Sequence, residues 1–203
     1  MKKLLKKLTL VSLVVLLVWC GTVLADRNTL RQELIRLHVV ADSDAVQAQQ
    51  LKLQVRDAVI LSMRQGLCNV TDVQQAKAYL QSSLPKLQQI ANAVLAKAGS
   101  DLTAAVTLEE EAFPVREYET FRLPAGVYES LRIVIGEGKG QNWWCVVFPE
   151  LCLPATSEGF ETVAAGSGFA DGLASTLTGE SEYEIRFFLL DCLGRLENFF
   201  FRG

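Results

Sequence analysis

The stretch YESLRIVIGEGKGQNWWCVVF, residues 128–148, predicts two strands joined by a glycine-rich connection. In the first strand, every second residue from Leu131 to Ile135 is apolar, which is the pattern of a strand with one buried face. Residues 143–148 are apolar on both faces, which favours a central strand covered on both sides. The glycines within residues 136–140 predict a flexible hairpin connection.

Upstream of this stretch, the sequence predicts a further strand and two helices. Residues 35–40, IRLHVV, alternate and indicate a strand with one buried face. Asp44 is expected to cap a helix that runs to about Met63. Thr71 is expected to cap a second helix, which Pro85 kinks or divides. Both helices carry apolar residues at helical spacing, so they should pack on the sheet.

The remaining segments complete an α+β domain at residues 26–153. Residues 104–112 and 115–121 predict two more strands, so we expect an antiparallel or mixed sheet of about five strands packed with two to three helices. A Gly/Ser/Ala-rich loop should follow at residues 154–181. A helix at residues 182–203 should then pack on the core through an apolar stripe. The stripe comprises Leu189, Leu193, Leu196 and Phe200.

Residues 1–25 have the layout of a secretory signal peptide or a membrane anchor. Lysines open the segment, an apolar run follows from Leu8 to Leu24, and a Val-x-Ala end places cleavage after Ala25. The run is short for a membrane span, which needs about 20 residues. Cleavage is therefore favoured, and an uncleaved anchor is the alternative.

The charge balance argues against recognition of polyanions. The chain has 20 basic and 23 acidic residues, a net charge of −3. Residues 1–25 contain four of the lysines and no acid, so the remainder carries 16 basic against 23 acidic residues, a net charge of −7. A nucleic-acid or anionic-membrane binder that relies on a basic patch is disfavoured.

No motif in the chain indicates a cofactor or a metal. GEGKG at residues 136–140 lacks the spacing of a Walker loop and leads into a strand, unlike a dinucleotide fingerprint. One histidine and no Cys-x2-Cys pair offer little for a metal. The glutamates at 109–111 are interpreted as a solvated strand edge, because neighbours on a strand point to opposite faces.

A thiol hydrolase is the enzymatic alternative. It would pair Cys145 with His38, the single histidine, and Asn142 or Asp44 would orient the imidazole. Cys145 lies within an apolar strand, however, where a thiol has a raised pKa and behaves as a small hydrophobe. A packed or disulfide-bonded cysteine is therefore favoured over a nucleophile.

Four cysteines follow residue 25, and outside the cytoplasm they can form disulfides. Cys145 and Cys152 are the nearest pair and flank a candidate turn at Pro149. A bridge between them is geometrically reasonable, and free thiols are the alternative. The sequence cannot choose among the three full pairings of four cysteines.

The adjacent tryptophans Trp143 and Trp144 suggest a surface for a protein partner. Tryptophan is favoured both in cores and in binding hot spots. Since side chains alternate along a strand, one ring should be core and the other can lie at the surface, beside the glycine connection that carries Lys139.

Two blocks of the sequence resemble the stage II sporulation protein R family. They are RLHVVADSD with LKLQVRDAV, and FRLPAGVYESLRIVIGEGKGQNWWCVVFPELC. The resemblance covers about residues 30–153. Asp42 stands where the family tends to have Asn and Ala48 where Asp is common, which puts partner contacts by those two positions in question.

The resemblance implies a secreted intercellular signalling protein of sporulation and not an enzyme. Such proteins are exported from the forespore into the space between the forespore and mother-cell membranes. There they activate a membrane-embedded aspartic protease that carries out sigma factor processing in the mother cell. No catalytic residue, metal or cofactor is implied. The candidate partner-binding residues are His38, Asp44, Arg56, Glu137, Lys139, Asn142, Trp143 and Trp144.

Overall fold

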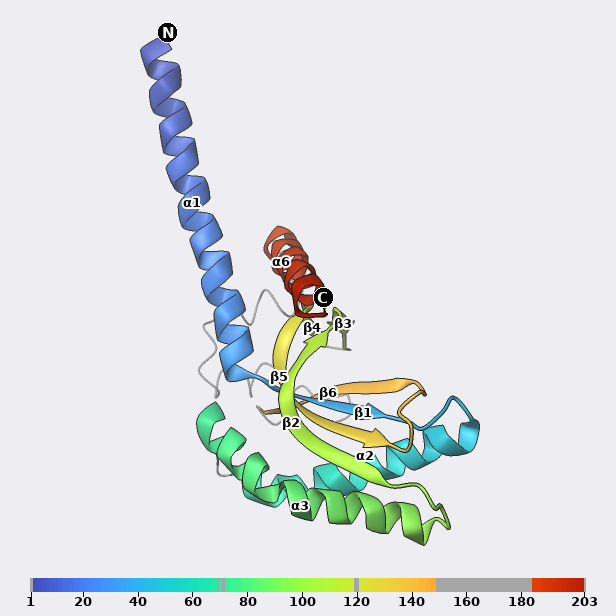
Figure 1. Ribbon diagram of the computed structural model, residues 1–203. Coiled ribbons are helices and arrows are strands. Elements are labelled where there is room, and N and C mark those ends of the chain that lie inside the picture. Colours follow the sequence, from blue (N-terminus) through green and yellow to red (C-terminus); the bar gives the residue numbers. More distant parts are fainter. Residues whose placement is uncertain (1, 69, 71, 119–120, 149–183, 203) are drawn as a thin grey trace.

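A computed structural model describes residues 2–68, 70, 72–118, 121–148 and 184–202 (Figure 1). Within these residues, four strands form a mixed sheet in the order β2-β5-β1-β6, and β3 and β4 form a separate small pair. The predicted α+β class is confirmed. The elements are α1 (Lys2–Glu33), β1 (Ile35–Val40), α2 (Val46–Leu67), α3 (Val73–Lys97), β2 (Ala104–Phe113), β3 (Arg116–Glu117), β4 (Arg122–Leu123), β5 (Gly126–Ile135), β6 (Asn142–Phe148) and α6 (Glu184–Arg202).

The N-terminal segment forms one long helix that projects away from the domain (Figure 1). α1 is long and apolar enough to cross a membrane, and it continues past Ala25 to Glu33. This finding is compatible with both a signal peptide and an anchor. The last turns of α1 belong to the folded domain, because Leu30 is buried there.

The glycine connection does not close a hairpin. β1 lies between β5 and β6, pairing parallel with β5 and antiparallel with β6. The predicted hairpin is therefore wrong: the connection at residues 136–141 passes over the end of β1. On its other edge, β5 pairs antiparallel with β2, from Ala104 opposite Ile135 to Phe113 opposite Gly126.

β1 and β6 do not have the burial and the position in the sheet that their side-chain patterns predicted. All six residues of β1 are buried, including Arg36 and His38, although the alternation indicated one exposed face. β6, whose apolar residues predicted a central strand, lies at the edge of the described sheet, and Trp143 at its beginning is exposed. The polar side chains of β1 are buried because aromatic rings and Tyr118 and Glu111 from distant segments contact them.

α2 and α3 cover one face of the sheet and form the main core with it (Figure 1). Leu131, Ile133 and Ile135 face this core, as predicted. α3 runs through Pro85 as one helix, so the expected division into two helices does not occur. Its N-cap is Asp72, whose carboxylate accepts a hydrogen bond from the Gln75 N–H at 2.9 Å.

The helix α2 begins without a side-chain cap. Its N-cap residue is Ala45, so the predicted capping role of Asp44 is wrong. The Asp44 carboxylate instead accepts a hydrogen bond from the backbone of the connection before β6.

Within the predicted strand at residues 115–121, the described residues form a strand at Arg116–Glu117, which pairs with Arg122–Leu123. Residues 119–120 lie outside the described part of the chain. The Gly/Ser/Ala-rich loop predicted at residues 154–181 lies outside the described residues.

The C-terminal helix α6 packs on the end of the sheet with part of the predicted stripe, because Leu189 and Leu193 pack against the core there. Phe187, Leu190 and Gly194 are buried, whereas Leu196 and Phe200 are exposed. Gly194 permits this packing because a Cβ there would lie 1.6 Å from the Ala125 carbonyl oxygen.

Polar side chains on the buried side of α6 satisfy backbone groups at the end of the sheet. Asp191 accepts a hydrogen bond from the Ala125 N–H at 3.0 Å, and Glu197 accepts one from the Val127 N–H at 3.1 Å. Asn198 donates to the Phe113 carbonyl at 2.7 Å. Because buried backbone groups need partners, these polar side chains face the sheet among the apolar residues of α6.

Candidate interaction surface

Two loops at one end of the sheet are fastened to each other. The loop after β1, residues 41–45, contacts the connection before β6, residues 136–141; we call this pair of loops the latch. The Asp42 carboxylate accepts a hydrogen bond from the Glu137 N–H at 2.9 Å, and the Asp44 carboxylate accepts one from the Gln141 N–H at 2.7 Å. Two backbone hydrogen bonds, between residues 139 and 42 and between residues 140 and 41, complete the contact.

Glycine is required at three positions of the latch. Gly136 and Gly138 have φ angles of +57° and +63°, which side chains disfavour. A Cβ on Gly140 would lie 2.3 Å from the Ser43 carbonyl oxygen. The glycines therefore serve to hold the two loops close together, and the connection is a fixed structure within the described residues.

Lys52 supports the latch from α2. Its ammonium group donates to the Gln141 carbonyl at 2.9 Å and to the Gln49 side chain at 2.6 Å. The pKa of Lys52 is lowered chiefly because burial disfavours the charged form, and the nearby Arg56 guanidinium acts in the same direction. The latch is thus tied to the helix layer as well as to β1.

Five of the predicted partner-binding residues lie on or beside the latch. Glu137 and Lys139 are exposed and pair with each other at 2.5 Å. Asn142 is also exposed. Trp143 is 37% exposed, and the Arg56 guanidinium lies 4.1 Å from its ring centroid, a cation–π contact that holds the ring in place. We call Glu137, Lys139, Asn142, Trp143 and Arg56 the edge surface.

Two of the predicted residues lie elsewhere, on the opposite face of the sheet. His38 and Trp144 stack with ring centroids 3.8 Å apart. The His38 Nδ1 atom lies 2.7 Å from a Glu111 carboxylate oxygen, and Phe113 packs edge-on against Trp144. Since His38 is buried, this group belongs to a second hydrophobic core, on the side of the sheet away from α2 and α3, and is not a surface.

Asp44, the eighth predicted residue, acts in the latch through its carboxylate. Asp44 is exposed and lies beside the edge surface. Its role is to position the connection before β6.

The alternation of side chains along paired strands separates Cys145 from His38, the two residues of the thiol hydrolase alternative. Cys145 is opposite Leu37 in the ladder and packs against the α2–α3 core, whereas His38 is opposite Trp144 and faces the other side of the sheet. Neighbouring residues of a strand point to opposite faces. The thiol and the imidazole therefore do not form a nucleophile–base pair.

The predicted bridge between Cys145 and Cys152 stays a prediction, because Cys152 lies outside the described residues. Cys68 and Cys192 are exposed free thiols.

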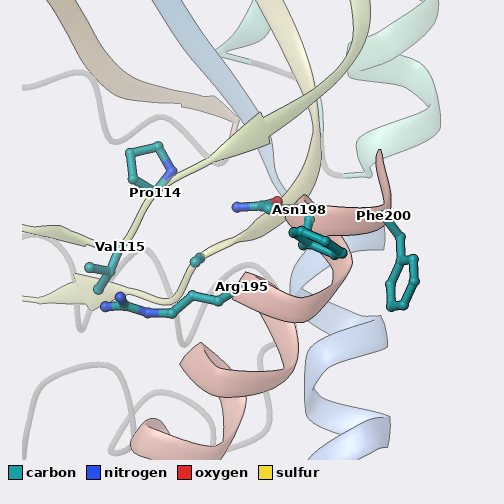
Figure 2. Close-up of a pocket in the computed structure, with 7 residues that line it drawn as sticks. Pro114, Val115, Arg195, Asn198 and Phe200 are labelled. Carbon is teal, nitrogen blue, oxygen red and sulfur yellow. The ribbon is translucent and has the colours of Figure 1, made fainter. Parts of the chain in front are cut away.

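A cavity of about 650 Å³ lies between α6 and the segment that follows β2 (Figure 2). Its lining is mostly apolar, and Arg195 extends from α6 toward Val115. The Asn198 side-chain oxygen is buried nearby, and no residue in the described part of the chain forms a hydrogen bond with it. The lining residues are Pro114, Val115, Ala125, Arg195, Asn198, Phe199 and Phe200.

Sequence reasoning missed Glu111 and the α6 cavity. Glu111 was interpreted as part of a solvated edge, but its carboxylate contacts His38 and Arg132. The signal available for α6 was Gly194, which marks the side of a helix that approaches another backbone closely.

Comparison with known proteins gives one family. The sequence model of the family described as stage II sporulation protein R matches residues 31–158. The stage II sporulation protein R of Bacillus subtilis (strain 168) is 38% identical over 125 residues, which are 62% of this chain and 56% of that relative. The chain therefore spans just over half of the length of the relative. No solved structure matches the chain.

Proposed function

The chain belongs to the stage II sporulation protein R family, and from that membership we propose that it is an exported signalling protein of sporulation. In this proposal the domain acts in the space between the forespore and mother-cell membranes. It binds and activates a membrane-embedded aspartic protease, which then processes a mother-cell sigma factor precursor. The chain itself acts as a ligand and not as an enzyme.

The arrangement of α1 and the domain supports export. A helix of membrane length precedes the folded domain directly, without a linker between Glu33 and β1 at Ile35. Cleavage after Ala25 would release the domain, and retention of α1 would anchor it. Both outcomes place the domain on the far side of the membrane that exports it.

The observation that carries the proposal is the exposed Trp143 at a fixed sheet edge. Binding hot spots are enriched in tryptophan and arginine, and a preorganised surface loses less entropy on binding. Trp143 is held by Arg56 and follows a connection that the latch fixes by hydrogen bonds on both of its ends. Lys139 and Glu137 add exposed charges of both signs beside it.

The proposal is tested by co-expressing the chain, the candidate protease and the sigma factor precursor in a non-sporulating host. We expect processing with the full chain and its loss when residues 1–25 are deleted, because the domain then stays in the cytosol. Trp143→Ala and Lys139→Ala should each reduce processing. Leu61→Ala is the matched control, since Leu61 is 69% exposed on α2 and lies outside the edge surface.

Normal processing by a folded, exported Trp143→Ala protein would show that the edge surface is not the contact. Equal processing with and without residues 1–25 would contradict the export part of the proposal. Far-UV circular dichroism of each variant checks that loss of processing does not reflect loss of folding.

A further inference from the structure

The outward side of α6 is apolar along most of its length. Six residues at helical spacing form this side, and none of them is charged; we call them the outer face. Phe188 and Phe199 on it are 64% and 73% exposed. The outer face comprises Ile185, Phe188, Cys192, Leu196, Phe199 and Phe200.

Three charged residues of α6 are turned toward the protein. Arg186, Asp191 and Glu197 are mostly buried and paired. Arg195 is exposed beside the outer face, and its guanidinium pairs with Asp191 at 2.7 Å. The inward side of α6 also carries apolar residues, since Phe187 and Leu190 are buried and Leu193 packs on the core. The helix therefore has apolar side chains on its outward side as well as on the side that faces the core, unlike an ordinary surface helix.

Ion pairs fix α6 to α1 just beyond the apolar run. Arg186 donates to Asp26 at 2.6 Å, and Glu197 pairs with Arg31 at 2.9 Å and also with Arg27. In Figure 1, α6 lies beside the lower half of α1, between the apolar part of α1 and the sheet.

The spacing of these contacts keeps α6 at one level along α1. Arg186 and Glu197 are about 16 Å apart along α6, whereas their partners at positions 26 to 31 span only about 7 Å along α1. The outer face thus lies close to the level at which the apolar run ends, where a bilayer crossed by α1 would have its headgroups.

We propose that the outer face of α6 inserts into the interfacial region of the lipid bilayer that α1 enters. Most of the large apolar side chains of α1 up to Leu24 are exposed, as are those of the outer face, so one apolar environment would cover both. Phenylalanine and leucine are typical of the apolar side of an interfacial helix. Insertion is apolar and not electrostatic, because the outer face has no cation and the chain has a net charge of −3.

This contact does not depend on retention of α1. The α1 residues that bind α6 are Asp26, Arg27 and Arg31, all of which follow the predicted cleavage position at Ala25. A cleaved domain would keep α6 in place and stay at the membrane surface. The inference therefore stands independently of the proposed activation of a protease.

Cys192 allows a direct test, because it is a natural thiol on the outer face. The full chain is reconstituted in vesicles of zwitterionic phosphatidylcholine, with a nitroxide label on Cys192 alone and the other cysteines changed to alanine. Electron paramagnetic resonance then compares the accessibility of the label to oxygen, which concentrates in lipid, and to a water-soluble nickel complex. The matched control carries the label on Cys68, which is exposed at the end of α2.

We expect the Cys192 label to be accessible to oxygen and protected from nickel, and the Cys68 label to be accessible to nickel. Phe188→Glu with Phe199→Glu should return the Cys192 label to water, whereas Leu61→Glu should not. Equal nickel accessibility at both positions would overturn the proposal. Low accessibility to both reagents at Cys192 would also overturn it, in favour of a protein contact such as a second copy.

A second measurement uses the unsubstituted chain, so it does not depend on the folding of cysteine variants. A lipid-soluble photoreactive carbene is activated in the same vesicles, and labelled peptides are mapped by mass spectrometry. We expect labelling of α1 and of residues 185–200, with none around Leu61. Absence of label from α6 while α1 is labelled would overturn the proposal.

Discussion

The Asp44 carboxylate lies 2.7 Å from the backbone nitrogen of Gln141, a contact across 97 residues of sequence. This hydrogen bond, together with that of Asp42 to Glu137, fixes the connection from which β6 begins. The position of Trp143 at the sheet edge thus depends on a carboxylate in the loop after β1. The latch explains how two blocks that are distant in sequence form a single surface.

Asp44→Ala should loosen the latch without unfolding the domain. Loss of one partly solvated hydrogen bond should lower the free energy of unfolding by about 0.5–1.5 kcal/mol, measured by urea denaturation. Hydrogen exchange at the Gln141 amide should accelerate at the same time. Asp101→Ala is the control, because Asp101 is an exposed acid outside the latch. Unchanged exchange at Gln141 would show that the hydrogen bond does not hold the loop.

Gly194→Ala should destabilise the packing of α6 although alanine favours helices more than glycine does. The added Cβ would lie 1.6 Å from the Ala125 carbonyl oxygen, so the helix must move away from the sheet. We expect the free energy of unfolding, measured by thermal denaturation, to fall by about 1–3 kcal/mol. Cys192→Ala, on the exposed side of the same helix, should have little effect. A more stable Gly194→Ala protein would contradict the close approach.

Tyr128 should make stability fall at high pH. Burial raises the pKa of Tyr128 to about 12, whereas in the unfolded chain it is about 10. The unfolded chain therefore loses this proton first as pH rises. The raised pKa therefore contributes roughly 2–3 kcal/mol to the free energy of unfolding. This contribution is fully present below pH 10 and is lost between pH 10 and 12.

Comparison with Tyr128→Phe isolates this effect from the titration of other groups. At pH 8 the natural chain should be the more stable, because the Tyr128 hydroxyl donates to the Pro124 carbonyl at 2.9 Å. The difference in urea midpoint should shrink and then reverse as pH approaches 12. A constant difference over this range would show that the folded-state pKa of Tyr128 is not raised.

Arg36 offers a test of what a buried guanidinium contributes. It is fully buried, its carbon lies 4.1 Å from the Phe113 ring centroid, and one of its nitrogens donates to the Tyr118 hydroxyl. Its other two nitrogens have no hydrogen-bond partner among the described residues. Replacement of a buried charge by an apolar residue of similar volume is often neutral or stabilising.

Arg36→Met should therefore change the free energy of unfolding by less than about 1 kcal/mol or raise it. Arg36→Ala should lower it by roughly 2–4 kcal/mol, because a cavity forms beside Phe113. Chemical denaturation of the two variants provides the comparison. Equal and large losses for both would show that the charge itself stabilises the fold.

Much of the candidate surface could be predicted because its residues are close in sequence. Glu137, Lys139, Asn142 and Trp143 follow one another along the connection and the start of β6, and alternation indicated that one tryptophan is more exposed than the other. His38 and Trp144, which are also candidate partner-binding residues, lie apart from the edge surface. Their environment depends on Glu111 and Phe113, which come from a strand that sequence spacing does not relate to them.

Residue pattern alone was enough to predict the apolar N-terminal helix, the α+β class, most of the strands and helices, and the inward side of β5. These features depend on local periodicity, which reports how a segment divides apolar from polar side chains. The place of β1 between β5 and β6, and the inward position of Asp191 and Glu197 on α6, emerge only when the segments are assembled. Backbone hydrogen bonds between strands are nearly independent of residue type, so local sequence does not select the neighbour of a strand. A polar side chain can be buried wherever a distant backbone group or ring provides its partner, and only the assembled fold provides those partners.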